Sequence, residues 1–193
     1  MAKATPTKGL NRSAFDNLLL YICQQVPPDE LGKTKLCKCL WFSDLRAYAE
    51  LGKSITGERY IKGQHGPIPA DLPQVLIDLE RKHRLATRKR RHFQGQYQYE
   101  QHEFVPLVEP DIKSQFSTEQ MAIIGEVIHY VCHEHTAKEI SELTHNRIWE
   151  LAEIGEEIPL QTAFVIRMGE VTEEDMKWGR RVIAERSAAS AAA

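Results

Sequence analysis

Residues 33–51 constrain the fold most, because their pattern predicts a helix that needs neighbours on several sides. The apolar positions recur at helical spacing and cover more than half of the helix circumference. They are Leu36, Cys37, Leu40, Trp41, Leu45, Tyr48 and Leu51. Gly52 follows as a natural C-terminal stop. A helix of this kind is expected at the centre of a mainly helical domain.

Further helices and a few strands are predicted on both sides of this segment. Ser13 is expected to cap the first helix, and Pro67 and Pro69 fit the start of the third. The helices cover residues 14–26, 70–83, 118–131, 137–144, 147–152 and 173–183. Three strands that form one small sheet are expected at residues 59–62, 87–93 and 97–105.

The domain organisation follows from these elements. Capping-box pairs open two helices of the C-terminal half, Ser117 with Gln120 and Thr136 with Glu139. We find no internal repeat and no linker that divides the chain. We therefore predict one compact α+β domain, mainly α-helical with a small antiparallel β-sheet or hairpin. It covers residues 11–186, with the hairpin near 87–105, between a flexible lead (1–10) and a flexible tail (187–193).

Charge is distributed unevenly along the chain. The formal net charge is −2, yet residues 81–92 hold seven of the 25 basic residues and no acid. Residues 109–176 carry 15 acids against four bases. The sequence therefore predicts an acidic body with one basic projection. This pattern argues against a general nucleic-acid coat and allows a local contact with an anion.

The location is predicted from what the sequence lacks. No apolar run approaches the roughly 18 residues that a membrane span needs. The N-terminal residues have no apolar stretch typical of a signal peptide. A cytoplasmic protein without a membrane partner is expected. Four cysteines do not make a disulfide scaffold in a chain of 193 residues, and cytosolic thiols stay reduced.

Two segments raise the possibility of nucleic-acid binding. A basic hairpin that follows helices resembles the wing of a winged helix, in which basic side chains contact phosphates of the nucleic acid. Its basic residues alternate between the two faces of a strand, so they do not all face one partner; they are Arg88, Lys89, Arg90 and Arg91. Residues 136–155 open like a helix-turn-helix. The helix in the recognition position carries acids that repel phosphate, namely Glu150, Glu153, Glu156 and Glu157.

The C-terminal half contains a cluster of residues that could act as metal ligands. His129 and His133 lie four apart on a predicted helix, with Cys132 and His135 beside them. A helical pair of histidines is common by chance, and the chain has no CxxC pair. No metal and no cofactor is predicted.

Catalysis has little support in the sequence. The chain lacks the GxSxG, GxxxxGK[ST] and HExxH motifs of common hydrolases, nucleotide-binding proteins and metalloproteases. Asp44, His65 and His145 are compatible with a polar constellation, but such groups more often lock loops by buried hydrogen bonds. The chain is therefore predicted not to be an enzyme. A metal-dependent or hydrolytic enzyme stays open as an alternative hypothesis.

Two motifs about 100 residues apart carry a family resemblance. The first comprises Lys35, Leu36, Lys38, Leu40, Trp41, Phe42 and Asp44, then Gly52, Ile55, Thr56, Tyr60, Gly66 and Pro67. The second comprises Glu142, Thr144, His145 and Trp149. Their order and spacing resemble the Panacea domain, also called the SocA-like antitoxin domain, from about residue 15 to 165. The departures are Cys39 in place of an aliphatic residue, the unusually basic residues 88–92 and the tail after Arg186.

The resemblance implies the antitoxin of a bacterial or phage toxin–antitoxin pair. Such a protein neutralises a cognate toxin by direct protein contact. In one branch of the family the antitoxin also acts as an adaptor that presents its toxin to a ClpXP-type protease. The chain ends in Ala-Ala, as degradation tags do, although a plain tail also fits.

The leading hypothesis is a non-enzymatic antitoxin, and the alternative is a winged-helix-like nucleic-acid-binding regulator. We expect either the basic hairpin (88–91) or the acidic residues (150–157) to contact the toxin. An acidic patch is suited to a toxin that binds RNA, because it mimics phosphate. The motif residues are expected to be scaffold. Trp41, Phe42, Tyr60 and Trp149 are assigned to the core, and His65, Gly66, Pro67 and His145 to conformational locks.

Overall fold

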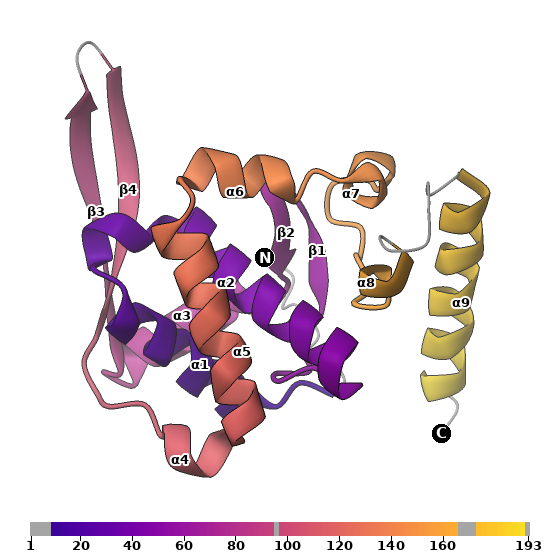
Figure 1. The fold of residues 1–193 in the computed structure, drawn as a ribbon, viewed down its shortest axis with the longest axis horizontal. Coiled ribbons are helices and arrows are strands. Elements are labelled where there is room, and N and C mark those ends of the chain that lie inside the picture. Colours follow the sequence, from indigo (N-terminus) through magenta and orange to yellow (C-terminus); the bar gives the residue numbers. More distant parts are fainter. Residues whose placement is uncertain (1–8, 95–96, 166–172, 192–193) are drawn as a thin grey trace.

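The computed structural model describes residues 9–94, 97–165 and 173–191 (Figure 1). Most of the expected flexible lead and the last two residues lie outside this part. The predicted class is confirmed: the protein is mainly α-helical, with two small antiparallel sheets of two strands each. The elements in chain order are α1 (Arg12–Gln25), α2 (Pro28–Leu51), β1 (Tyr60–Gly63), β2 (Gly66–Pro69), α3 (Leu72–Arg81), β3 (Leu85–Gln94), β4 (Tyr97–Pro106), α4 (Ile112–Gln115), α5 (Thr118–Ile128), the π-helix η1 (His129–His133), α6 (Ala137–Leu143), α7 (Arg147–Leu151), α8 (Thr162–Val165) and α9 (Glu173–Ala191).

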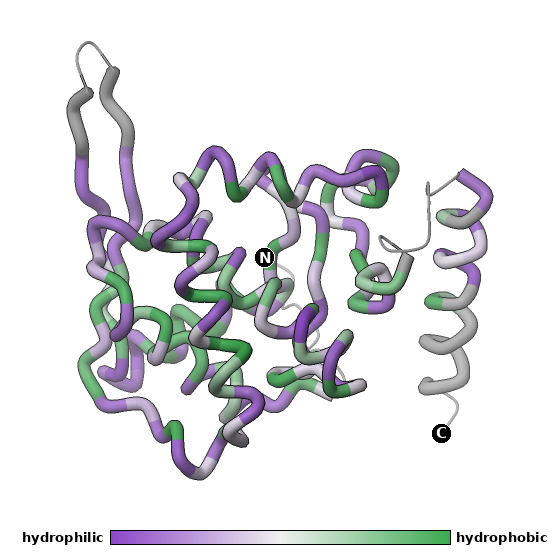
Figure 2. The backbone as a smooth tube through the Cα atoms, in the orientation of Figure 1, coloured by the Kyte–Doolittle hydropathy of each residue, from purple (hydrophilic) through white to green (hydrophobic). Residues whose placement is uncertain are grey.

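Helix α2 lies at the centre, as its apolar pattern predicts. It contacts α1, α5, η1, α6, α8, β2 and β4. Gly32, with φ of 55°, interrupts the helix after its first turn, so the regular part begins near the predicted start. Gly52 ends it in the left-handed conformation and donates its N–H to Tyr48 O. Figure 2 shows apolar residues along α1, α2 and α5, which supply most of the buried core.

A buried carboxylate fastens the loop after α2 back onto the helix. Asp44 is fully buried and accepts hydrogen bonds from the backbone N–H groups of Ile55 (2.7 Å) and Thr56 (2.8 Å). It also accepts from the hydroxyls of Thr56 and Tyr60, the latter at 2.8 Å. Burial raises the pKa of Asp44, and these hydrogen bonds oppose the rise. Asp44 therefore acts as a loop lock, as the sequence favours.

The expected three-stranded sheet is wrong. Strands β1 and β2 form a hairpin in which Tyr60 pairs with Pro69 and Gly63 with Gly66. The other edge of β1 is occupied by the segment 155–158: Lys62 N donates to Glu156 O (2.8 Å), so β1 has no free edge that could pair with β3. Pro67 and Pro69 consequently lie in β2, and α3 begins at Leu72.

Strands β3 and β4 form the predicted hairpin, which projects from the helical body (Figure 1). Its base is anchored in the core by Leu85 and Phe104, both buried. Strand β3 extends beyond the prediction by two residues at its start and one at its end, and β4 extends by one residue at its end. The basic segment of β3 is therefore presented on a projecting arm.

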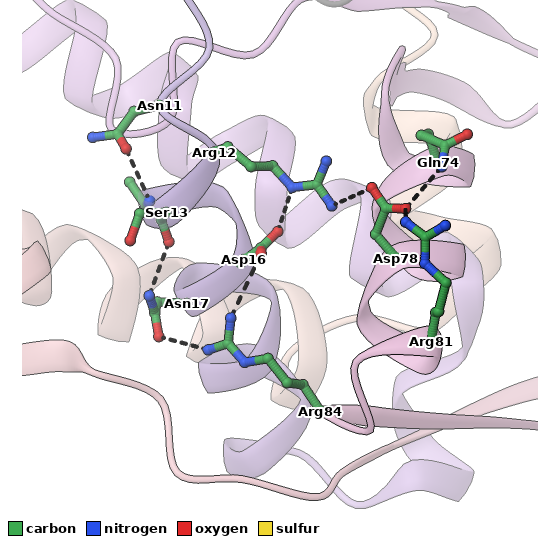
Figure 3. A network of polar contacts seen from close by, with 10 residues as sticks. Asn11, Arg12, Ser13, Asp16, Asn17, Gln74, Asp78, Arg81 and Arg84 are labelled. Carbon is green, nitrogen blue, oxygen red and sulfur yellow. Dashed lines mark hydrogen bonds and ion pairs between the residues drawn. The ribbon is translucent and has the colours of Figure 1, made fainter. Parts of the chain in front are cut away.

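A polar network joins α1 to α3 at the base of this arm (Figure 3). Arg12 contacts Asp16 (2.6 Å) and Asp78 (3.2 Å), and Arg84 lies 3.6 Å from Asp16. Asn11, not the predicted Ser13, caps α1 by accepting the N–H of Ala14. Two basic residues near the arm are thus engaged within the fold.

Helices α7, α8 and α9 lie together on one side of the domain (Figure 1). Both predicted capping boxes are present, at the starts of α5 and α6. Helix α9 contacts α7 and continues to Ala191, whereas a loose tail was expected from residue 187. In the part of the chain that the structure describes, no helix is both long and apolar enough to cross a membrane.

Candidate functional site: a motif-held turn beside an apolar groove

The two sequence motifs meet at the turn between β1 and β2. Three side chains from different helices donate hydrogen bonds to carbonyls of this turn and its flanks. Lys38 of α2 donates to Pro67 O (3.2 Å), and Ser141 of α6 donates to His65 O (3.1 Å). Trp149 of α7 donates from its indole N–H to Gly63 O (3.1 Å). The scaffold role expected for Lys38 and Trp149 thus has a geometric basis.

Gly66 occupies the most crowded point of the turn. Its φ is +96°, and a Cβ placed there would collide with Lys38 Nζ and Thr144 Oγ1. Thr144 is itself fixed, because its hydroxyl donates to Ser141 O (2.7 Å). The turn, α2 and the end of α6 therefore meet where only a residue without a side chain fits.

Lys38 is a buried amine among backbone acceptors. It is 1 % exposed, and burial lowers its pKa to about 8. Its ammonium donates to the carbonyl of Pro67, which satisfies one of its three donors. A charged Lys38 therefore opposes folding at neutral pH.

His145 belongs to a stack of rings rather than to a catalytic dyad. Its ring lies 3.7 Å from that of Trp149 at 9°, and Lys62 Nζ lies 4.1 Å from the Trp149 ring centroid. Burial lowers the pKa of His145, with further lowering by the charge of Lys38. Ser141 Oγ is 3.4 Å from His145 Nε2, but its proton is donated to the His65 carbonyl. This serine is thus held as a hydrogen-bond donor to the turn.

A groove of about 880 Å³ opens beside this turn, and both motifs border it. Trp41 and Phe42 come from the first motif, and Thr144 comes from the second. Phe42 meets Tyr130 of η1 edge-on, with ring centroids 6.2 Å apart. Other apolar walls are formed by Leu45, Ala49, Val127, Leu143 and Ala163. Phe42, expected in the core, is therefore only partly buried and lines a surface.

The rim of the groove carries more negative than positive charge. Arg46 contacts both Glu50 and Glu126, each at 2.9 Å, so two carboxylates surround one guanidinium. Glu134 lies on the same rim, 3.3 Å from His129. The sequence patterns did not single out Tyr130 or Leu143, because no motif or charge pattern marks them. Their exposures of 39 % and 53 % place them in the groove wall.

The four bases of the hairpin are divided between its two faces, as strand alternation predicts. Arg88 and Arg90 both contact the buried Glu103, and Lys89 contacts Glu100 (2.8 Å). Arg91 lies opposite Glu100 in the strand register. Two glutamates of β4 therefore neutralise part of the positive charge of β3.

The four acids expected on one helix face are placed differently. Glu150 lies on α7, and the other three follow it in the turn that pairs with β1. Glu156 contacts Arg180 (2.8 Å), which lowers its pKa. Burial raises the pKa of Glu157, which lies 3.9 Å from Arg59. A continuous acidic helix face is therefore not formed by these residues.

The histidine cluster of the C-terminal half does not converge on one point. His129 and His133 are 5.6 Å apart by ring centroid, and His135 Nδ1 bonds Tyr130 O. Among the described residues, no group of three His, Cys, Asp or Glu side chains is arranged to hold a metal ion.

A comparison with known families shows the family of this chain. A family model described as antitoxin SocA-like, Panacea domain, matches residues 36–150. The chain belongs to this family. No curated protein and no solved structure gives a match. The matched part of the Panacea domain includes the β1–β2 turn, the projecting hairpin and most of the groove, so both surfaces are built on the family's own segments.

Replacement of Gly66 in this Panacea domain tests the crowded turn. Gly66→Ala is expected to lower the free energy of unfolding by about 3 kcal/mol, since it adds both a collision and a strained positive φ. Gly52→Ala is the matched control, because Gly52 also has a positive φ but open space around it. It should lower the free energy of unfolding by about 1 kcal/mol. Urea denaturation measures both, and equal losses would contradict the collision.

The buried amine predicts a pH dependence of stability. Between pH 8 and about 10.5 the folded state holds neutral Lys38 while the unfolded state still binds its proton, so raising the pH favours folding. The unfolding free energy of the wild type, relative to Lys38→Met, should rise by about 3 kcal/mol across this window. Lys33→Met, at an exposed position on the same helix, is the control and should show no such rise. A flat difference for Lys38→Met would refute the buried-amine assignment.

Proposed function

We propose that this chain is a non-enzymatic antitoxin that neutralises a cognate protein toxin by direct binding. The observation that carries the proposal is the match of the SocA-like antitoxin family to residues 36–150. A binding protein of this kind needs a rigid scaffold and a recognition surface. The locks at Asp44 and at the β1–β2 turn supply the scaffold, and the groove supplies a surface. The expected site of action is the cytoplasm.

The groove fits an amphipathic helix of the toxin that has large apolar residues and flanking basic residues. Its size and aromatic walls suit the apolar face of a helix, which is a common mode of peptide recognition. At its rim the carboxylates of Glu50 and Glu126 contact the single guanidinium of Arg46, and Glu134 adds a third carboxylate beside His129. Residues 109–176, which contribute Tyr130, Leu143 and other lining residues, carry 15 acids against four bases. This complementarity favours a positively charged partner and speeds its association.

The hairpin and the acidic turn are proposed as additional contacts. All four basic side chains are exposed; Lys89 and Arg91 share the face of the arm that also holds the exposed Glu100, whereas Arg88 and Arg90 contact the buried Glu103. Glu150, which pairs with Arg147, and Glu153 are exposed, whereas Glu156 and Glu157 are partly buried beside Arg180 and Arg59. Within the residues that the sequence indicates, we therefore propose Lys89 with Arg91 and Glu150 with Glu153 as the contact pairs. Presentation of the toxin to a ClpXP-type protease remains a prediction from the family, and nucleic-acid binding remains a prediction from the basic hairpin.

Co-expression tests the antitoxin function itself. The neighbouring open reading frame is induced alone and then together with this chain, while growth is followed and the pair is co-purified. Growth arrest alone, rescue together and a co-eluting complex are expected. Arrest without rescue, or rescue without a complex, would exclude neutralisation by binding.

A single charge in the groove should disrupt the complex. Leu143→Asp places a carboxylate in the apolar wall and is expected to weaken toxin binding at least tenfold, with loss of rescue. Leu107→Asp is the matched control, because Leu107 is also 53 % exposed and lies outside the groove lining. It should leave binding within about twofold of the wild type. Titration of the purified toxin measures both, and equal affinities for the two variants would remove the groove as the docking site.

Charge reversal separates the two additional surfaces. One variant combines Lys89→Glu with Arg91→Glu, and the other combines Glu150→Lys with Glu153→Lys; neither touches the buried Glu103. At least one should lower toxin affinity about tenfold at low salt, with a smaller effect at high salt. Unchanged binding in both would limit the contact to the groove. A high 260/280 nm absorbance ratio that the hairpin variant abolishes would instead support nucleic-acid binding.

A further inference from the structure

Two cysteines far apart in the sequence face each other inside the domain. Cys39 lies on α2 and Cys132 on η1, and their sulfur atoms are 3.6 Å apart. Both thiols are free and buried, and they are separated by 93 positions in the chain. Cys23 and Cys37 are also free and buried. From the sequence, all four are expected to be reduced thiols.

We propose that Cys39 and Cys132 form an intramolecular disulfide when the protein meets a hydroperoxide, and that this bond fastens η1 to α2. The inference goes beyond the antitoxin function and does not depend on it. A disulfide brings the sulfur atoms to about 2.05 Å, so they must approach by about 1.5 Å. Rotation of two side chains and a small shift of η1 supply such a movement. A π-helix is suited to it, because its wider turn is commonly a site of local adjustment.

The two thiols differ in exposure and in pKa, and these differences indicate which one reacts with the oxidant first. Cys132 is 5 % exposed and Cys39 is completely buried, so a small oxidant reaches Cys132 first. The hydrogen bond with Cys39 lowers the pKa of the Cys132 thiol, burial opposes this, and the charge of Lys35 lowers it further. Burial, followed by the bond to Cys132, raises the pKa of the Cys39 thiol well above its usual range. Lys35 is held at this point because its ammonium donates to Cys132 O (3.0 Å).

The chemistry proceeds in two balanced steps. The Cys132 thiolate attacks an oxygen of the hydroperoxide, the O–O bond breaks, and the leaving alkoxide or hydroxide takes up a proton. The Cys39 sulfur then attacks the resulting sulfenic acid, its own proton leaves with the hydroxyl as water, and the S–S bond forms. Two thiols and one hydroperoxide thus give one disulfide, one alcohol or water from the peroxide, and one further water. The sulfur pair loses two electrons and the peroxide gains them.

The cross-link would act on the wall of the groove. Helix η1 carries His129 and Tyr130, which line the groove, and α2 carries Trp41 and Phe42 opposite them. A bond between Cys39 and Cys132 fixes these two walls relative to each other. Restricting the unfolded chain over a long loop should also raise the thermal midpoint of the oxidised protein.

Peptide mapping of the full chain tests the proposal directly. The native protein is treated with hydrogen peroxide, unfolded, blocked with N-ethylmaleimide and digested with trypsin. Cys39 and Cys132 then lie on separate peptides, 39–46 and 114–138, and Cys37 lies on a third, 36–38. We expect a species that joins peptides 39–46 and 114–138 with the loss of two hydrogen atoms in mass. It should disappear on reduction, and its appearance should accompany a rise in the thermal midpoint.

Variants and a denatured control make the result specific. Cys39→Ser and Cys132→Ser should each abolish the cross-link, and Cys23→Ser, which alters another buried thiol, should retain it. The wild-type map decides the matter even if a serine variant does not fold. Four fully blocked thiols after peroxide treatment, or a bond to Cys23 or Cys37 instead, would overturn the proposal. A cross-link that forms equally well in urea would overturn it too, since the native geometry would then play no part.

Discussion

Burial of three polar side chains on the central helix organises the rest of the molecule. Lys35, Lys38 and Asp44 all lie on α2 among apolar neighbours, and each finds its partner in a different segment. Lys35 donates to Cys132 O in η1, Lys38 donates to Pro67 O in β2, and Asp44 accepts from the loop that leads to Tyr60. A buried polar group without a partner is strongly unfavourable. The helix therefore determines where three otherwise irregular segments lie.

The groove is a consequence of this arrangement. Trp41 packs edge-on against Tyr60, with ring centroids 4.9 Å apart, and thereby connects the groove floor to the Asp44 lock. Thr144 connects the opposite end to the crowded turn at Gly66. The surface proposed to bind a toxin thus rests on motif residues that are themselves fixed from behind. Such preorganisation reduces the entropy that binding must overcome.

Ion pairs within the fold reduce the charge that the basic and the acidic segments of the sequence present to a partner. Residues 81–92 contain seven bases and no acid, which along the chain resembles an anion-binding segment. In the structure, Glu100 and Glu103 of the neighbouring strand contact three of these bases, and Arg84 joins the network with Asp16. The four acids of residues 150–157 are divided in the same way between solvent and fold. The surfaces left for a partner are smaller than the sequence indicates.

The sequence by itself determined the central helix, both capping boxes, the β3–β4 hairpin and the family, because these depend on local periodicity, end residues and short spacings. It also indicated Asp44 and Gly66 as locks without their partners. Tertiary structure decided the sheet pairing, since the segment 155–158 competes for the β1 edge and no local signal reports that competition. It likewise decided that Phe42 lines a groove and that Cys39 faces Cys132. Those relations join residues on different elements, and local patterns carry no information about which distant faces meet.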